Sequence, residues 1–535
     1  MKSKIILRLL LVIAILTLIL RLSVNVFIEP WLVKKIQKSF NEKYQSYTLS
    51  ISKIDIFMLS PGIELKNITI QSNQDFSGNG SFQAVVASVK IKGIRIAKAV
   101  FRKEITIRDV SIFNPVFKGE IPFPGKENPP VISNKSIQVN RTCIDKIDLA
   151  VSNISDAQSI SIKQGILNLY NINVEKMDTL SLGVINQFDF EAEELGLVSA
   201  DSMYSHTALD IRYDTLINSL VVKSFSVKPN FSDQNFMDRH EYQTDRFDGD
   251  FSKLIIHKVN LADYFKSRQL KCSFVDIGKM ELNVFRDQRK EFRHSIKPAF
   301  QEILYGFPGT IHIDSLGITS GNVTYREHAP EANEAGSLRF FKMDAKMYNI
   351  FNDPIYKTES KFLELKAHAS LMGKGNLQVH LKGKLYDKEN SFSLTGTLSN
   401  FEIRDLNPYL EKNAFIYATS GKIETMNFDF IADNTKATGQ IIILYEGLDI
   451  ALKNKQTDDT TGIKERFISY LANRYIIDSN PVAGEDVRVG IIDRERDPER
   501  SVFNYAAKSI ISGIKGSITK GSGKSKNSKS RLHLN

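Results

Sequence analysis

Residues that commonly mark chemistry are scarce in this chain. Its 535 residues include two cysteines and one tryptophan. Cys143 and Cys272 lie in strand-like runs, and neither has the nearby cysteine or histidine of a metal site. An oxidising compartment would allow them to form one disulfide, whereas two buried free thiols are an equal alternative. The cysteines therefore predict no metal site and leave their own pairing open.

Catalytic motifs are missing as well. The nine histidines are scattered, without an H-E-x-x-H motif or an i, i+4 pair. The sequence has no G-x-S-x-G, and its acidic residues are spread along polar strand faces. The G-S-G-K-S stretch at 521–525 resembles the end of a phosphate-binding loop, but the first glycine would fall at Ile518 and no strand leads into it. We therefore predict no enzyme, no catalytic residue, no metal and no cofactor.

One long hydrophobic run stands at the N-terminus, from Ile5 to Leu22. It is close to the lower limit for crossing a bilayer, and we predict that residues 1–22 are a cytoplasmic stub and a transmembrane anchor. Basic residues precede the run, so the positive-inside rule places Met1 in the cytoplasm and the body outside it. The alternative is a cleaved signal peptide, but no small-x-small cleavage pattern follows the run. The residues that we expect to contact the lipid are Ile5, Leu9, Val12, Ile15 and Leu18, with Trp31 as an interfacial residue.

Residues 23–45 are predicted to form an amphipathic helix. Pro30 suits a first helical turn, and Trp31, Ile36 and Phe40 recur at roughly helical spacing. This helix could lie along the outer face of the membrane, where tryptophan is frequent. A helix that plugs the end of the following domain is an equal alternative.

From residue 46 to about 455 apolar and polar residues alternate. This pattern predicts strands with one apolar and one wet face, joined by Gly, Asn, Asp and Ser clusters. A series of such strands predicts a mainly β protein with a long antiparallel sheet. Its apolar side could be covered by a second sheet, closed into a barrel or curled into a groove. The residues expected to line a groove are Leu363, Leu365, Leu377, Val379, Leu381, Phe392, Leu394, Phe428 and Phe430.

Weak internal repeats support an extended array of strands. Segments that begin near residues 105, 270 and 311 share a plan, and a shorter relative spans 159–170. We interpret each copy as a strand, a short turn and a second strand that ends in an aromatic and a basic residue. Such repetition is typical of solenoid-like growth.

The region from 456 to 518 is predicted to be largely helical. Residues 463–476 have helical spacing, and a strand-like stretch follows Pro481. Val502–Ile518 reads as an amphipathic helix with an apolar stripe. This helix could pack on the last strands, or it could dock on a membrane or a partner. The stripe consists of Phe503, Ala507, Ile510, Ile514 and Ile518.

The net charge of +10 is concentrated at the C-terminus. Residues 514–535 carry six Lys or Arg and no acid, so the body is nearly balanced. We interpret 519–535 as a basic disordered tail, which either is simply solvated or contacts anionic lipid headgroups. A chain exported past a membrane is not expected to bind nucleic acid.

The stretch 371–450 contains D-L-N-P-Y-L at Asp405–Leu410 and a G-x-I-x-x-M-x-F-x-F strand at Gly421–Phe430. With these motifs it resembles the C-terminal module of AsmA-like proteins. The anchor followed by S-I-S-K-I-D-I-F-M-L-S-P-G-I-E-L-K-N-I-T-I is similar to that family's opening.

The resemblance, which extends to TamB-type and bridge-like lipid transfer relatives, implies a single-pass inner-membrane protein of a Gram-negative envelope with a periplasmic body. It also implies a groove that carries phospholipid acyl chains in outer-membrane lipid homeostasis or biogenesis, with an outer-membrane or envelope protein as a partner at the C-terminal end. The alternative is a non-enzymatic assembly or scaffolding factor that regulates outer-membrane protein assembly.

Overall fold

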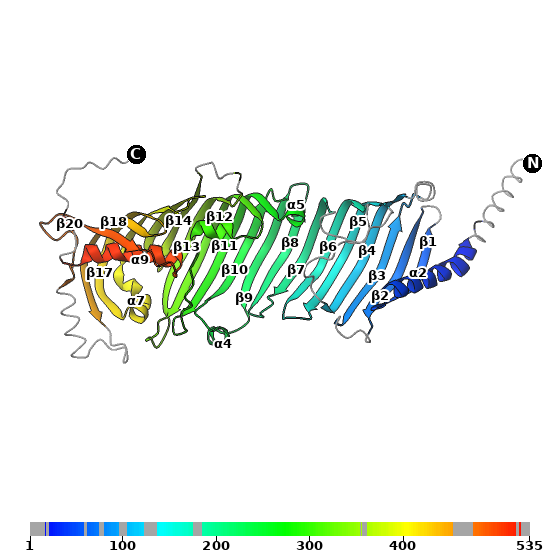
Figure 1. The fold of residues 1–535 in the computed structure, drawn as a ribbon, viewed down its shortest axis with the longest axis horizontal. Coiled ribbons are helices and arrows are strands. Elements are labelled where there is room, and N and C mark those ends of the chain that lie inside the picture. The colour runs from blue at the N-terminus through cyan, green and yellow to red at the C-terminus, as the bar shows by residue number, and fades with distance from the viewer. Residues whose placement is uncertain are drawn as a thin grey trace, which may run out of the picture. The chain divides into compact units, whose positions relative to one another are not determined.

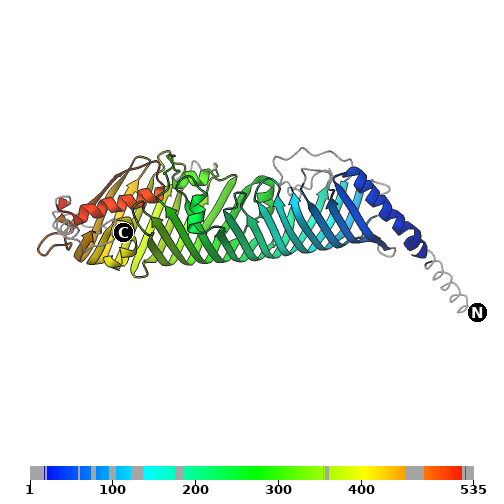
Figure 2. The same ribbon diagram turned by 90° about the horizontal axis from the view of Figure 1, so that it is seen from below.

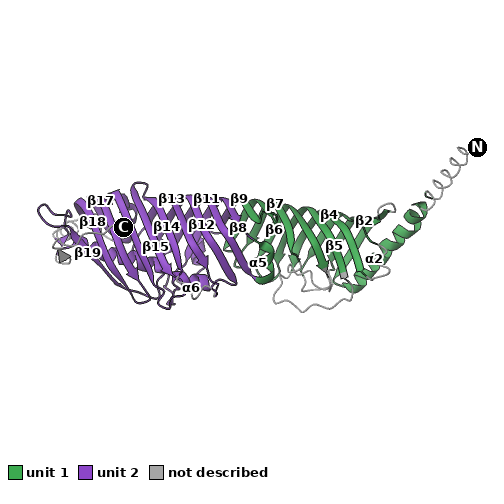
Figure 3. Cartoon of the chain, turned by 90° about the horizontal axis from the view of Figure 1, so that it is seen from above, with its two compact units in different colours: residues 1–223, 260–267 green, residues 224–259, 268–535 purple. Residues whose placement is uncertain are grey.

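The chain folds into two compact units made mainly of β-strands. The computed structural model describes residues 17, 21–57, 61–73, 80–95, 104–121, 136–174, 185–353, 355, 361–452, 475–520 and 524–525. Unit 1 comprises residues 1–223 and 260–267, and unit 2 comprises residues 224–259 and 268–535 (Figure 3). The expected anchor residues Ile5, Leu9, Val12, Ile15 and Leu18, most of the 463–476 helix and most of the tail lie outside the described residues.

In unit 1 each strand pairs with the next along the chain, from β1 to β8 (Figure 1). The strands are β1 (Tyr47–Phe57), β2 (Gly62–Ser72), β3 (Phe82–Lys92), β4 (Glu104–Ile121), β5 (Ser136–Asn153), β6 (Ser159–Val174), β7 (Gln187–Val198) and β8 (Tyr204–Asp214). β9 (Ser219–Pro229) begins in this unit and ends in unit 2. The helical elements are the π-helix η1 (Val24–Ile28), α2 (Glu29–Lys43) and α5 (Leu261–Ser267).

Unit 2 repeats this sequential pairing from β10 to β20. Its strands are β10 (Asp245–His257), β11 (Gln269–Asp287), β12 (Thr310–His328), β13 (Gly336–Phe351), β14 (Phe362–Leu371), β15 (Gly375–Lys384), β16 (Phe392–Glu402), β17 (Ile416–Ala432), β18 (Lys436–Leu452), β19 (Arg488–Glu495) and β20 (Lys524–Ser525). Its helices are α4 (Asp233–Asp238), α6 (Phe300–Tyr305), the 3₁₀ turn η4 (Ile403–Leu406), α7 (Asn407–Asn413) and α9 (Val502–Ile518).

The expectation of a purely antiparallel sheet is wrong at two places. β4 pairs with β5 in parallel, with Glu104 opposite Ser136, and β11 pairs with β12 in parallel, with Gln269 opposite Thr310. A parallel pair needs a crossover connection, and the one between β11 and β12, residues 288–309, carries α6. The repeats noted near residues 270 and 311 are therefore two neighbouring strands in register. The sheets are mixed and mostly antiparallel.

The repeats are also single strands, which corrects the strand–turn–strand interpretation. Where a turn was expected, the strand continues through a bulge-like residue with positive φ, such as Asn114 (50°) in β4 and Ser320 (63°) in β12. Such an extra residue turns the two-residue alternation into a three-residue step. In β4 the apolar positions therefore run Ile105, Ile107, Val110, Ile112, Pro115 and Phe117.

The three-residue step keeps apolar side chains on one face. In β1 it separates Ile51 from Ile54, and in β2 it separates Leu65 from Ile68. Strict alternation would send Ile51 and Ile54 to opposite faces. Both nevertheless lie in one apolar cluster with Leu65 and Ile68. The three-residue step thus allows the strand to bend while its apolar side chains stay on the same face of the sheet.

Helix α2 covers the side of β1 that faces away from β2. The buried Glu29 accepts a hydrogen bond through Oε1 from the Ile56 amide (2.9 Å), and Asn41 Oδ1 accepts one from the Leu49 amide (2.8 Å). Strand backbone that finds no strand partner is thereby satisfied, which blocks addition of another strand.

The apolar side of α2 packs on the same strands. Its packed residues are Leu32, Val33, Ile36 and Phe40, around Leu49 and Ile51. Pro30 stands in the first turn, as predicted. This confirms the interpretation of a helix that plugs the end of the next domain. Trp31 points elsewhere: it is 56% exposed, with Lys35 Nζ 4.6 Å from its ring centroid, and its contact with a membrane stays a prediction.

The D-L-N-P-Y-L stretch forms the end of η4 and the start of α7. Asn407 is buried, donates from Nδ2 to the Ala418 carbonyl (2.9 Å) and accepts from the Ala418 amide (2.8 Å). This two-way bond satisfies both polar groups and joins α7 to β17.

Helix α9 packs against β18 and β19 through small residues (Figure 1, Figure 2). Its N-cap Ser501 accepts a hydrogen bond from the Asn504 amide. A Cβ atom on Gly490 of β19 would lie 2.0 Å from the Gly513 carbonyl oxygen, so the helix backbone lies directly on the strand. The buried positions of the helix are Val502, Tyr505, Ser509, Gly513 and Ser517.

The interpretation that this helix packs on the last strands is confirmed, but its packing face is not the predicted stripe. Phe503 is 69% exposed, Ala507 is exposed, and Ile510, Ile514 and Ile518 are only half-buried at the margin of the core. The close approach at Gly490 admits only small side chains between helix and strand. The bulky apolar stripe is therefore displaced to one side of the buried face.

We expect Gly490→Ala to lower the free energy of unfolding of unit 2 by about 1–3 kcal/mol, the range typical of an overpacked core. The added methyl group meets a backbone oxygen, which no rotamer change can relieve. Urea unfolding and hydrogen exchange of α9 would measure the loss. Gly317→Ala in β12 is the matched control, because its Cβ meets only the half-buried Phe274 ring, at 3.1 Å. Equal losses in both variants would contradict this account.

Candidate functional site

The predicted groove residues share one face of β14–β17. Cross-strand pairs join Leu365 to Leu381, Leu381 to Leu394 and Leu394 to Phe430. Leu365, Leu377 and Val379 are half-buried. The other six, Leu363, Leu381, Phe392, Leu394, Phe428 and Phe430, are each at most 6% exposed. The sequence thus places all nine on the correct face.

Helices cover this part of the face. The Phe392 ring lies 6.2 Å from that of Tyr505 in α9 and 5.8 Å from that of Phe300 in α6, both edge-on. Phe430 lies in the same cluster and is 1% exposed. These residues form a protein core beneath α6 and α9, whereas the sequence predicted that they line a groove. A charged substitution at Leu394 would therefore destabilise the fold, and its effect would not report on function alone.

A half-buried stretch of the same face continues over β10–β13. Leu282 pairs with Gly249 of β10 and with Val323 of β12. These residues lie on the same face as the buried core of β14–β17. Phe247 is 43% exposed. The other half-buried apolar residues there are Phe251, Leu254, Ile256, Ile277, Leu282, Val284, Leu316, Ile318, Val323, Met343 and Met347. We call this set the open face.

The sequence analysis missed the open face. Strict alternation assigns Ile277 and Met280, or Ile318 and Val323, to different faces, although the pairing register places them on one. A search for apolar residues at spacing 2, 3, 2 would have found them.

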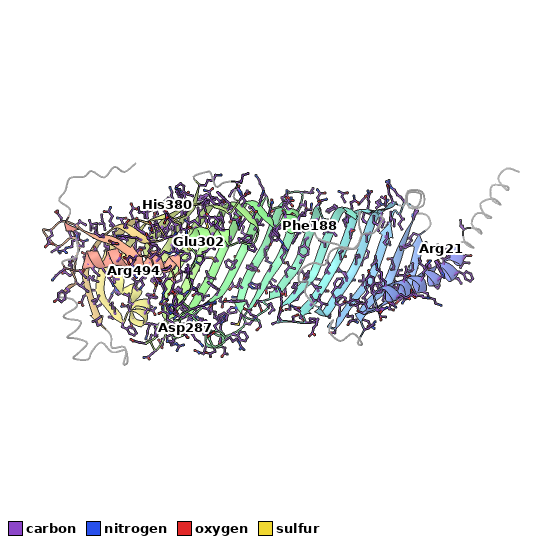
Figure 4. The ribbon with its side chains drawn as sticks, in the orientation of Figure 1. Arg21, Phe188, Asp287, Glu302, His380 and Arg494 are labelled. Carbon is purple, nitrogen blue, oxygen red and sulfur yellow. The ribbon has the colours of Figure 1, made fainter. Side chains whose placement is uncertain are left out.

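Unit 1 has a corresponding apolar face that is covered at two places. α2 packs at β1 and β2, and α5 brings Phe265 to within 6.0 Å of Phe188 in β7 (Figure 4). Between them some apolar residues of β4–β6 are half-buried, among them Ile107, Ile112 and Leu167, whereas Ile147, Val151, Leu169 and Ile172 are buried. Each unit therefore combines covered and less covered apolar strands.

The opposite face of unit 2 is polar and contains a hollow of about 800 Å³. One row of paired residues crosses it from β11 to β17: Asp276, Gly317, Lys346, Lys366, His380, Thr395 and Asp429. The two aspartates stand at the ends of this row and the basic residues Lys346, Lys366 and His380 in its middle, so neither sign dominates. The hollow therefore selects no charged ligand class by itself.

Glu364 is the hub of the ion pairs beside this hollow. Its Oε1 lies 2.6 Å from His380 Nε2 and 3.2 Å from Lys366 Nζ. The hydrogen bond from His380 is the main cause that holds the pKa of the Glu364 carboxyl below its usual value. Burial opposes it, and the hydrogen bond from Lys366 adds a smaller lowering. His368 lies 3.6 Å from Asp344. These contacts stabilise the wet face and resemble no acid–base pair.

Both cysteines are free thiols in this structure. Cys272 in β11 is buried, and burial raises the pKa of its thiol to about 11. Burial also raises the pKa of the half-buried Cys143. Within the described ranges, no group of three or more His, Cys, Asp or Glu side chains could hold a metal ion. The same ranges contain no helix long and apolar enough to span a membrane.

No family model matches this chain, and no curated protein matches it.

We expect Glu364→Gln to destabilise the protein by less than about 1 kcal/mol at pH 7, because the lost ion pairs are partly solvent-screened. The lowered pKa means that the carboxylate stabilises the fold above its unfolded pKa, and that this contribution is lost as the pH falls through the folded value. The difference between variant and wild type should therefore be smaller at pH 3 than at pH 7. Urea unfolding at both pH values measures it, with exposed Glu424→Gln on β17 as control. A difference that grows toward acid would contradict the assignment.

We expect Cys272 to react with iodoacetamide at pH 8 roughly a hundredfold more slowly than a free thiol, since burial both raises its pKa and blocks access. After unfolding in urea without reductant, both cysteines should label. Mass spectrometry of the labelled peptides provides the measurement. A single 143–272 disulfide in unreduced protein would overturn the assignment of two free thiols.

Proposed function

We propose that this chain is a non-enzymatic carrier of phospholipid acyl chains, which lie along the apolar faces of its sheets. The observation that supports the proposal is the open face of β10–β13. It continues the face whose C-terminal part is buried beneath α6 and α9. A face of this kind that stays half-exposed in a folded unit favours an apolar ligand.

Acyl chains suit the open face by shape and by chemistry. The face offers aliphatic, methionine and phenylalanine side chains over four adjacent strands, and each buried methylene contributes about 0.8 kcal/mol. Methionines such as Met343 and Met347 adapt to chains of different length. No covalent step is required. A chain moves readily only between positions of near-equal free energy, and a row of similar apolar strands supplies such positions.

The setting that we propose is the Gram-negative envelope. The hydrophobic run at 5–22 would anchor the chain in the inner membrane with its body in the periplasm, as in the AsmA-like and TamB-type proteins that the sequence resembles. Lipid would pass along the sheet in outer-membrane lipid homeostasis or biogenesis. An outer-membrane or envelope protein at the C-terminal end would be the partner.

A second candidate function is that of an envelope assembly or scaffolding factor. The core beneath α9 favours it, because that part of the apolar face is covered by the protein's own side chains. In this case the polar face and its hollow would bind proteins, and the purified chain would carry no lipid.

We expect Val323→Asp to abolish co-purification of phospholipid, or to reduce it at least tenfold, because a carboxylate on the open face would have to be desolvated by an acyl chain. Thr324→Asp is the matched control: it adds the same charge to the next residue of β12, on the polar face beside Arg339. Native mass spectrometry with lipid extraction would measure bound lipid in both variants and in the wild type.

The result separates the two functions. Lipid in the wild type and in Thr324→Asp, and its loss in Val323→Asp, support the carrier. A wild-type chain that is free of lipid under gentle conditions, or a Val323→Asp variant that folds and keeps its lipid, would refute the carrier and favour the scaffold.

A further inference from the structure

Helix α9 exposes an apolar stripe that the fold of unit 2 does not use. Phe503, Ala507 and Ile511 follow one another at i, i+4 and i+8, and all three are exposed. The exposed fraction is 69% for Phe503 and 41% for Ile511. The opposite side of the helix, from Tyr505 to Ser517, lies on the sheet. The exposed stripe is therefore a free surface of a helix held firmly from behind.

An aromatic neighbour extends this stripe at its N-terminal end. The Phe300 ring of α6 meets the Phe503 ring edge-on at 5.1 Å. One turn along α6, Ile303 is 53% exposed. Two segments far apart in the sequence thus contribute large apolar side chains to one region of the surface. Single exposed apolar residues are common in soluble proteins, but a row of them along a fixed helix needs an explanation.

The charged residues of α9 itself are both lysines. Lys508 and Lys515 are exposed along one border of it, and within the described part of the chain neither has an ion-pair partner. From residue 500 to the C-terminus the sequence contains no Asp or Glu. The eight basic residues there are Arg500, Lys508, Lys515, Lys520, Lys524, Lys526, Lys529 and Arg531.

We propose that the outer face of α9 is a docking surface for an anionic lipid bilayer. A stripe one helix wide, with lysines at its border, suits shallow insertion among headgroups. Each basic residue near an anionic surface adds to the attraction, so Lys508 and Lys515 would supplement the small apolar area. A protein partner would instead be expected to bury a broader surface, about 800 Å² on each side.

The inference does not depend on the carrier function. It assigns a second membrane contact to unit 2, apart from the expected N-terminal anchor. The small-residue face of α9 holds the stripe in position, so the helix can bind lipid without leaving the sheet.

The test uses the full chain, held in POPC nanodiscs and fixed to beads through an N-terminal tag. Fluorescent vesicles of POPC with 30% POPG are added, and vesicles of POPC alone provide the comparison. We expect capture of the anionic vesicles to exceed that of POPC vesicles at least tenfold and to fall in 0.5 M NaCl.

Two variants probe the two parts of the surface. F503S combined with I511S removes apolar contacts, and K508E combined with K515E reverses the charge. Each pair should reduce capture at least tenfold. Lys374→Glu with Lys388→Glu, exposed residues outside α9, is the matched control and should bind as the wild type does.

Circular dichroism and bound lipid by native mass spectrometry would be recorded for every variant. Normal fold and lipid content with lost capture support the docking surface alone. Capture that ignores the α9 substitutions, equal capture of POPC vesicles or no capture by the wild type would overturn it. Lipid content reports separately on the carrier.

Discussion

The fold depends on one constraint: a long strand must keep its apolar side chains on a single face while it bends. In a straight strand, alternation of apolar and polar residues keeps the apolar side chains on one face. A bend requires an inserted residue, and the insertion moves all following side chains to the opposite face. The three-residue steps at Asn114 and Ser320 resolve the conflict by inserting the residue where the apolar pattern itself shifts by one. The same step recurs in β1 and β2, where the two apolar halves of each strand meet in one cluster.

Covering the resulting faces and edges is the second requirement. In unit 1, α2 uses Glu29 and Asn41 to bind the outer side of β1 and uses its apolar residues to close the cluster beneath. In unit 2, α9 approaches β19 so closely at Gly490 that only a small residue, Gly513, fits opposite it. The open face and the outer stripe of α9 are the apolar surfaces that these helices leave uncovered. Both proposals assign a ligand to one of these uncovered surfaces.

Different interactions would bind the ligand at each of the two surfaces. The open face would hold single acyl chains by apolar burial alone, with each methylene adding a similar increment. The outer face of α9 would bind a bilayer by combining a few inserted side chains with the attraction between lysines and anionic headgroups. The ion pairs around Glu364 keep the reverse side of unit 2 wet, which is consistent with lipid on one face only.

The sequence alone determined that this is a mainly β protein, where most strands lie and which side of β14–β17 is apolar, because alternation depends only on the two-residue repeat of a strand. It also placed α2 and α9. Only the tertiary structure decided that two neighbouring pairs are parallel, since pairing direction depends on connections and not on the pattern within a strand. Likewise, the sequence marked Phe503, Ile510, Ile514 and Ile518 as the apolar stripe of a helix. The structure buried Ser509 and Gly513 instead, because the distance between two backbones decides which side chains fit between them.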